Sequence, residues 1–188
     1  IDVTGYYTLL SDAFVIRPSS YNNQDSILFD GTLSAVQSMQ NVAKATIYGF
    51  ESNLLVKFTK SLSLRSTLTY TYGHVKDEDV PLDHIPPIFG LSALKLDLNR
   101  FTAEFYARYN GWKKIDDYSN SGEDNEAYAT EDGMPSWYTL NVKASFQLNK
   151  FVGIQAGIEN ILDKHYRNFA SGISAPGRNV FVTFRGTL

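Results

Sequence analysis

Residues 61–74 read SLSLRSTLTYTYGH, and apolar and polar side chains alternate along most of this stretch. The apolar side chains share one face: Leu62, Leu64, Leu68, Tyr70 and Tyr72. Serine, threonine and arginine occupy the intervening positions. Successive side chains of a β-strand point to opposite faces of its sheet, so this period of two indicates a strand with one apolar and one polar face.

The same alternation recurs along the rest of the chain. Regular alternation marks Phe101–Tyr109, Ser136–Leu148 and Asn179–Leu188. Less regular segments that still have the composition of strands are Asp2–Arg17, Thr46–Phe58, Ile88–Leu98 and Val152–Ile161. The sequence therefore predicts an all-β fold of about eight strands, most of them about ten residues or longer, and no convincing helix.

The connections between these segments alternate in length. Three are tight polar turns, at Lys60-Ser61, Asn99-Arg100 and Asn149-Lys150. Four are long and polar, at Pro18–Ala35, Lys76–Pro87, Lys113–Pro135 and Asp163–Gly177. Hairpins that are short at one end and long at the other are typical of an antiparallel, up-and-down transmembrane β-barrel, whose strands of about 9–11 residues cross the bilayer.

Charged side chains lie in the middle of the predicted strands, on the polar face. They are Glu51, Arg65, Lys95, Glu104, Arg108, Lys143, Glu159 and Arg185. Such charges suit a hydrated barrel lumen, while the apolar face suits lipid. Tyrosine and phenylalanine gather near strand ends, as in the aromatic girdles of membrane barrels. A soluble β-sandwich that binds carbohydrate remains an alternative, and so does a small closed barrel with a structural or adhesive role.

Composition excludes several classes of function. The 188 residues include no cysteine and carry a net charge of −3, and 14% of them are aromatic. The missing cysteine excludes a disulfide scaffold and thiol catalysis, and the charge gives no reason to expect a nucleic-acid partner. No apolar run is long enough for a membrane helix. Since no nucleophile–base–acid set, P-loop or dinucleotide fingerprint occurs, we expect neither an enzyme nor a bound cofactor or metal.

From Gly49 onward, several motifs resemble the barrel of TonB-dependent outer-membrane receptors. Tyr48-Gly49-Phe50-Glu51 is similar to the start of a descending strand in that family, and Pro81-Leu82-Asp83-His84-Ile85-Pro86-Pro87 to its "PL..IPP" segment. Residues 132–141 resemble "DG.PGW..LN", residues 157–167 resemble "G.ENL.DK.YR", and Pro176-Gly177-Arg178 matches the "PGR" before the last strand. The sequences of these motifs are most similar to those of receptors for iron chelates and similar small ligands.

The resemblance implies that residues 1–188 are the C-terminal part of a barrel of about 22 strands, without its plug domain and earlier strands. It also implies active uptake of a scarce small ligand, such as a ferric siderophore, across the outer membrane of a Gram-negative bacterium. Haem, cobalamin, a metal ion or an oligosaccharide remain alternative ligands. The implied partners are the plug, the TonB complex acting through it, and the lipid and lipopolysaccharide of the membrane. Leu188 departs from the family, whose barrels usually end on an aromatic residue.

Candidate ligand contacts lie in the long connections. Rings and imidazoles that suit stacking or hydrogen bonding to a ligand are Trp112, Tyr118, Tyr128, His84 and His165. Membrane-interface anchoring explains Trp112 and Trp137 equally well, and lone surface histidines are common. Arg178 is expected to fix the last long connection to the barrel rim.

Two charged sets have competing interpretations. The connection from Asp116 to Asp132 holds acidic residues and no lysine or arginine, so it could bind a divalent cation, repel anions, or be a solvated loop. The mid-strand charges are expected to face the plug: Glu51, Arg65, Glu104, Arg108, Lys143, Glu159 and Arg185. A charge lattice that only solvates the wall is the alternative.

Overall fold

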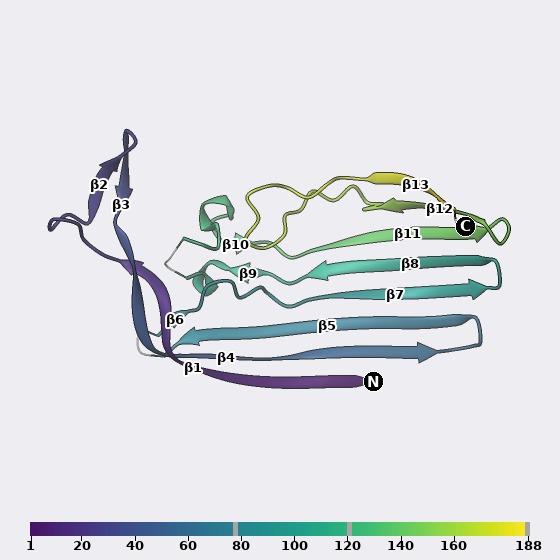
Figure 1. The fold of residues 1–188 in the computed structure, drawn as a ribbon, viewed down its shortest axis with the longest axis horizontal. Helices are drawn as coiled ribbons and strands as arrows, with labels where there is room; N and C mark the ends of the chain where they lie inside the picture. Colours follow the sequence, from purple (N-terminus) through teal and green to yellow (C-terminus); the bar gives the residue numbers. More distant parts are fainter. Residues whose placement is uncertain (77–78, 120–121, 187–188) are drawn as a thin grey trace.

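The fold is one broad antiparallel sheet, seen in a computed structural model that describes residues 1–76, 79–119 and 122–186, without the side chains of residues 13, 15, 42 and 43 (Figure 1). The strand order is β1-β4-β5-β7-β8-β11-β12-β13. Their bounds are β1 (Asp2–Pro18), β4 (Gln37–Lys57), β5 (Leu62–Val75), β7 (Phe89–Leu98), β8 (Phe101–Asn110), β11 (Trp137–Gln147), β12 (Val152–Glu159) and β13 (Asn179–Gly186). The predicted all-β fold of eight long antiparallel strands is confirmed.

Short pieces of secondary structure lie in the connections. They are β2 (Ser26–Phe29), β3 (Thr32–Ala35), β6 (Val80–Pro81), β9 (Lys113–Lys114) and β10 (Gly133–Met134), with single 3₁₀ turns η1 (Ile115–Asp117) and η2 (Glu126–Tyr128). In the part of the chain that the structure describes, no helix is long and apolar enough to span a membrane.

The tight turns all lie at one end of the sheet (Figure 1). In two of them, a polar side chain holds the backbone of the turn. Thr59 Oγ1 accepts the backbone N–H groups of Ser61 and Leu62, at 3.1 and 2.9 Å. Asn149 Oδ1 does the same for Phe151 and Val152, at 2.8 and 3.0 Å. Side chains that hold their own backbone in this way replace the ladder bonds that a reversing chain loses.

The strand register places all the predicted mid-strand charges on one face. Lys95, Glu104 and Lys143 lie directly opposite one another on β7, β8 and β11, and Lys143 Nζ lies 2.9 Å from Glu104 Oε1. Residues opposite each other in a ladder share a face, and the remaining pairings extend this face across the sheet. It carries Glu51, Arg65, Lys95, Glu104, Arg108, Lys143, Glu159 and Arg185. We call it the charged face.

Aliphatic and aromatic side chains cover most of the opposite face, which we call the apolar face. Two aromatic pairs cross from β4 to β5 near the long-loop end of this face: Tyr48 with Tyr72, 4.9 Å between ring centroids, and Phe50 with Tyr70, 5.9 Å. Many of its side chains are exposed, among them Leu94, Phe105 and Val182. A soluble protein would cover such a face with a second layer.

All eight long strands belong to this one sheet, so the alternative of a two-layer β-sandwich is wrong. The strand order begins at β1 and ends at β13, which makes the sheet open rather than a small closed barrel. The arrangement is that of a partial barrel wall.

The boundaries differ from the prediction mainly at β4. This strand begins at Gln37 instead of Thr46 and pairs with β1 from Gln37, opposite Pro18, to Asn53, opposite Asp2. The two strands form a ribbon beyond the rest of the sheet, and the expected loop at its end contains the β2–β3 hairpin (Figure 1). The last strand was expected to run to Leu188, which lies outside the described residues; β13 ends at Gly186.

Candidate functional site

The long connections meet at the end of the sheet opposite the tight turns (Figure 1). The described residues of these connections are 76 and 79–88 after β5, 111–119 and 122–136 after β8, and 160–178 after β12, and hydrogen bonds join the three connections. We call these connections together the outer loop cluster.

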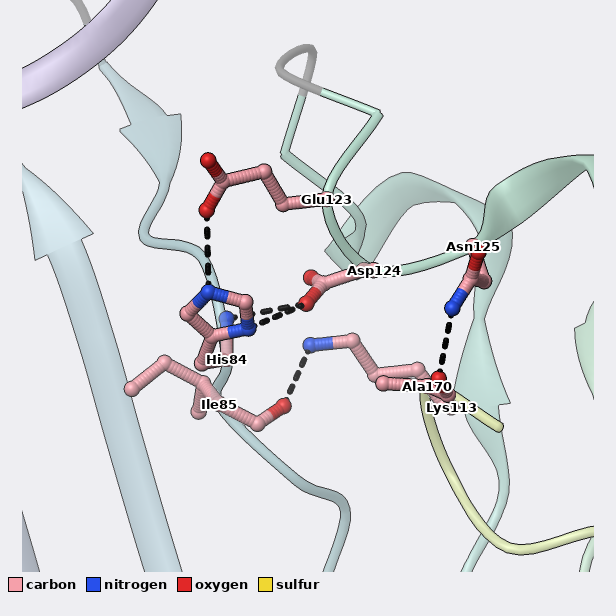
Figure 2. Close-up of polar contacts among 7 residues, drawn as sticks. All are labelled: His84, Ile85, Lys113, Glu123, Asp124, Asn125 and Ala170. Carbon is pink, nitrogen blue, oxygen red and sulfur yellow. Dashed lines mark hydrogen bonds and ion pairs between the residues drawn. The ribbon is translucent and has the colours of Figure 1, made fainter. Parts of the chain in front are cut away.

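Asp124 joins the first two connections of this cluster. Its Oδ1 accepts the backbone N–H of His84 at 2.9 Å and lies 3.5 Å from His84 Nδ1 (Figure 2). The other imidazole nitrogen of His84 lies 2.9 Å from Glu123 Oε2. The backbone of His84 is left-handed, with φ of 61°, which accompanies the turn of its N–H toward Asp124. Only 1% of the Asp124 side chain is exposed.

Burial makes the charge of Asp124 costly. Desolvation raises the pKa of this carboxyl, and the charge of Asp83 adds to the rise, whereas the His84 N–H and the Lys113 ammonium oppose it. Its second oxygen, Oδ2, is buried without a hydrogen-bond partner among the described residues. Asp124 therefore joins the first connection to the second, and burial makes its ionised form energetically unfavourable.

Lys113, in the second connection, makes a further hydrogen bond to the first connection. It is 4% exposed, and its Nζ donates to the Ile85 carbonyl at 2.7 Å (Figure 2). The ammonium also lies over the rings of Phe169 and Tyr118, 5.0 and 5.7 Å from their centroids. Burial lowers the pKa of Lys113, while the carboxylates of Asp124, Asp117 and Asp83 counter that fall.

The third connection is bound to the second through two further residues. Asn125 Nδ2 donates to the Ala170 carbonyl at 2.6 Å (Figure 2). Arg167 donates to the Tyr128 carbonyl at 2.8 Å and lies over the Tyr128 ring. The segment from Glu123 to Tyr128 thus holds the neighbouring connections on both sides.

Three of the five predicted ligand residues lie in this set of contacts: His84, Tyr118 and Tyr128. Tyr118 is buried, and desolvation raises the pKa of its hydroxyl, with Asp124 and Glu126 adding to the rise. Trp112 is 45% exposed and donates through Nε1 to the Asp132 carbonyl at 3.0 Å. His165 contacts Ser174 at 2.9 Å. Contact of these residues with a ligand stays a prediction.

Among the described residues of the acidic connection, no three His, Cys, Asp or Glu side chains gather in a way that could hold a metal ion. Asp124 is buried and bonded, so the interpretation of a purely solvated loop does not apply to it. The other acidic side chains of the connection, such as Asp116 and Asp117, are exposed.

Lys113, Asn125 and Phe169 are cluster residues that sequence reasoning missed. No local pattern marks them, because their partners lie 28 to 45 residues away along the chain for Lys113 and Asn125. The sequence offered one indication for Lys113, which is its position just before the acidic segment that begins at Asp116.

On the charged face, three of the residues predicted to contact the plug, Glu104, Lys143 and Glu159, are bonded to other residues of the sheet. Lys143 pairs with Glu104, and Glu159 accepts the Tyr106 hydroxyl at 3.2 Å. Glu159 also lies 3.4 Å from Asn179 Nδ2. Contact of Glu51, Arg65, Arg108 and Arg185 with a plug stays a prediction.

Comparison with known proteins gives this geometry its context. Among curated proteins, the ferric enterobactin receptor PirA of Pseudomonas aeruginosa is 26% identical over 163 residues, which cover 81% of this chain and 22% of the relative. The chain thus spans about a quarter of the length of the proteins that it matches.

Solved structures show the same fold at low identity. The copper transporter OprC superposes with a TM-score of 0.79 at 17% identity, over 98% of this chain and 28% of that one. A variant of the ferric enterobactin receptor PfeA of Pseudomonas aeruginosa, in complex with enterobactin, gives 0.73 at 19% identity over the same shares. The siderophore receptor PirA of Acinetobacter baumannii gives 0.59 at 16%, over 98% and 29%.

A family model supplies the assignment. The model described as TonB dependent receptor-like, beta-barrel, matches residues 1–161, which include every long strand except β13. Together with the one-sheet fold and its charged and apolar faces, this match shows that the chain belongs to the β-barrel family of TonB-dependent receptors.

Proposed function

We propose that this chain is the C-terminal part of the barrel of an outer-membrane receptor that takes up an iron chelate of the ferric siderophore type. The similarity to the ferric enterobactin receptor PirA carries this proposal, because it extends over 163 residues of sequence. The likeness to the copper transporter OprC rests on fold at 17% identity and gives no independent reason to prefer copper.

The two faces of the sheet support a place in the outer membrane of a Gram-negative bacterium. In this proposal the apolar face contacts acyl chains, with the tyrosines of β4 and β5 at the head-group level. The charged face borders a lumen that holds a plug, supplied by parts of the receptor beyond these residues. The TonB complex would deliver energy to the plug, so this chain has a transport role and not a catalytic one.

In this proposal, the outer loop cluster forms part of the ligand entrance. Tyr118 and Phe169 lie edge to face, 6.0 Å apart, and Trp137 packs on Tyr166 at 4.2 Å. Tyr118 and Trp137 are buried, so the rings that this cluster offers to a ligand with planar or partly apolar groups are the exposed ones, Trp112 and Tyr128. The contacts of Asp124 and Asn125 would hold these rings in place.

Uptake by cells tests the proposal. The intact receptor is expressed in a strain without its own siderophore receptors, and accumulation of ⁵⁵Fe is measured with catecholate, hydroxamate and citrate chelates. We expect TonB-dependent accumulation with one of these chelates. Accumulation of cobalamin, haem or copper, and of none of the iron chelates, would show that the ligand assignment is wrong.

A further inference from the structure

A groove of about 350 Å³ crosses β8, β11, β12 and β13 at the tight-turn end of the charged face. The pairing register places its polar residues in two rows. The row nearer the middle of the sheet is Thr102, Ser145, Gln155 and Thr183. The row nearer the turns is Arg100, Gln147, Gly153 and Arg185, in which the Arg100 carbonyl accepts the Gln147 N–H at 2.8 Å. Ser145 and Gln147 alternate with the face of Phe146 and follow Lys143, so the groove opens on the charged side.

The charge of this groove is positive and is not balanced by its surroundings. Two arginines line it, and no carboxylate does so among the described residues. Both arginine side chains are exposed. The nearest carboxylates of the sheet are already paired, because Asp97 lies 2.8 Å from Lys95 Nζ and Glu104 lies 2.9 Å from Lys143 Nζ. A negative charge that balances the two arginines must therefore come from outside these strands.

The donors of the groove suit a carboxylate. A guanidinium group is planar and presents several N–H donors in a fixed arrangement that matches the two oxygens of a carboxylate. Ser145, Thr183 and Gln155 add hydroxyl and amide donors between the two arginines. Gln147 is held by its own donation to the Asn149 carbonyl at 2.7 Å, and Gly153 has no side chain to fill the groove.

A plug in the lumen makes this charge complementarity necessary. The lumen of a 22-stranded transporter barrel is plugged. A plug that covers Arg100 and Arg185 removes water from both guanidinium groups, and a charge without water is costly unless it is paired and hydrogen-bonded. In the proposed function, membrane lipid contacts the opposite face and the TonB complex acts through the plug. The plug is therefore the partner that reaches the groove.

We infer that this groove binds an aspartate or glutamate side chain of the receptor's own plug domain. The guanidinium groups of Arg100 and Arg185 donate to that carboxylate and hold the plug to the wall at the tight-turn end. The inference rests on the plugged lumen of the proposed function and adds to it the chemistry of one contact. It is independent of the chelate that the receptor carries.

Zero-length cross-linking in the intact, purified receptor tests the inference. The single variants Arg100→Lys and Arg185→Lys keep the positive charge and place a primary amine in the groove. A carbodiimide joins such an amine to a carboxylate that is in direct contact with it, and peptide mass spectrometry identifies the linked residues. We expect each amine to be joined to an aspartate or glutamate of the plug.

The pair of Lys143 and Glu104, 2.9 Å apart within the wall, is the internal control for this reaction. Links from the introduced amines only to carboxylates of the wall or to TonB would overturn the inference. So would the absence of any link from them in a sample in which Lys143 is joined to Glu104.

Hydrogen exchange of the plug gives a second measurement. The double variant Arg100→Gln, Arg185→Gln should speed exchange in the cross-linked plug segment by about threefold to tenfold, as for the loss of one or two ion pairs. The matched double variant Lys60→Gln, Lys150→Gln removes the same charge from exposed residues of two tight turns, and its plug should exchange like that of the parent receptor. Equal changes in both double variants would overturn the inference. Both measurements are made without a chelate, so failure of ⁵⁵Fe uptake would contradict the proposed function and leave them unaffected.

Discussion

The ring of Phe181 on β13 covers Gly157, the residue directly opposite it on β12. A Cβ built on Gly157 would lie 2.6 Å from two ring atoms and 2.8 Å from the Val142 carbonyl oxygen on the other side. The glycine therefore has no space for a side chain, and the aromatic ring fills the place that a side chain would take. Rings that cover strand glycines in this way stabilise curved sheets.

Gly157→Ala should destabilise the barrel wall. The ring can move, but the Val142 carbonyl belongs to the ladder between β11 and β12, so we expect a loss of about 1–3 kcal/mol from overpacking. Thermal unfolding of the intact receptor in detergent measures the change. Gly5→Ala on β1 is the control, because its added Cβ would meet only the Gly49 carbonyl oxygen at 4.0 Å. Equal unfolding temperatures for the two variants would contradict this account.

Alternation along the chain was enough to predict the sheet and its faces. Apolar and polar side chains alternate with a period of two in a strand whose two faces meet different surroundings. The pairing register from β5 to β13 aligns the apolar side chains of neighbouring strands on one face. The start of β4 escaped prediction because residues 37–44 pair with β1 beyond the other strands of the sheet, where neither face has to be apolar. The β2–β3 hairpin could have been predicted from the dipeptide Asp30-Gly31, because Asp-Gly favours a two-residue hairpin turn. In the structure both residues have the positive φ that such a turn requires.

The outer loop cluster was predictable only in part. His84, Tyr118 and Tyr128 were recognisable as residues with binding chemistry, but their contacts are made between connections that are far apart in sequence. Nothing local indicates that Asp124 is buried while Asp116 and Asp117, from the same acidic connection, are exposed. Such differences arise from packing between loops, which a single sequence does not encode as a pattern.

Lower pH should tighten the outer loop cluster. The pKa of Asp124 is raised by burial, so the folded state binds this proton more tightly than the unfolded state does. The resulting stability is fully present below the ordinary Asp pKa of about 3.9 and is lost as the pH rises through the raised value. Hydrogen exchange of residues 79–88 and 122–128, corrected for the intrinsic chemical rate, should therefore slow as the pH falls from 7 toward 4.

Two substitutions at Asp124 separate its charge from its hydrogen bond. Asp124→Asn keeps an oxygen for the His84 N–H and removes the titrating group, so exchange in the cluster should lose the pH dependence that this carboxyl causes. Asp124→Ala leaves the His84 N–H without its acceptor, and should speed exchange at every pH by an amount equivalent to about 1–3 kcal/mol. An unchanged pH profile in Asp124→Asn would show that other groups control the cluster.

Asn160 should be essential for the last long connection. Its backbone is left-handed, with φ of 49°, and its Oδ1 accepts the Lys164 N–H at 2.8 Å while its Nδ2 donates to the Lys164 carbonyl at 2.8 Å. Its own N–H donates to Asn141 Oδ1. Asn160→Ala removes the side-chain bonds and strains the backbone, so we expect a loss of about 2 kcal/mol or more.

Asn160→Gly distinguishes these two causes, because glycine adopts a positive φ without strain. If this variant unfolds at the parent temperature, the side-chain bonds contribute nothing. The far end of the same connection is bonded to its own start: Arg178 Nε donates to the Ile161 carbonyl at 3.0 Å, and the Arg178 N–H donates to Asp163 at 2.7 Å. Attachment of Arg178 to the barrel rim stays a prediction. Asn160 Nδ2 also donates to the Pro176 carbonyl at 3.3 Å, so removal of the Asn160 side chain should speed hydrogen exchange at both ends of the connection, in residues 161–166 and at Gly177 and Arg178.

Spin labels at adjacent positions of β5 test which face meets lipid. Leu68 lies on the apolar face, while Thr69 lies opposite Glu51 on the charged face. In the intact receptor in a bilayer, a label at Leu68 should collide more often with oxygen, which concentrates among acyl chains, and one at Thr69 with a water-soluble nickel complex. A single-residue shift exchanges the two faces of a strand, so this pair is sensitive to any error in register. If the Thr69 label were the one in contact with lipid, the assignment of the two faces, and with it the lumen and the plug contacts, would be wrong.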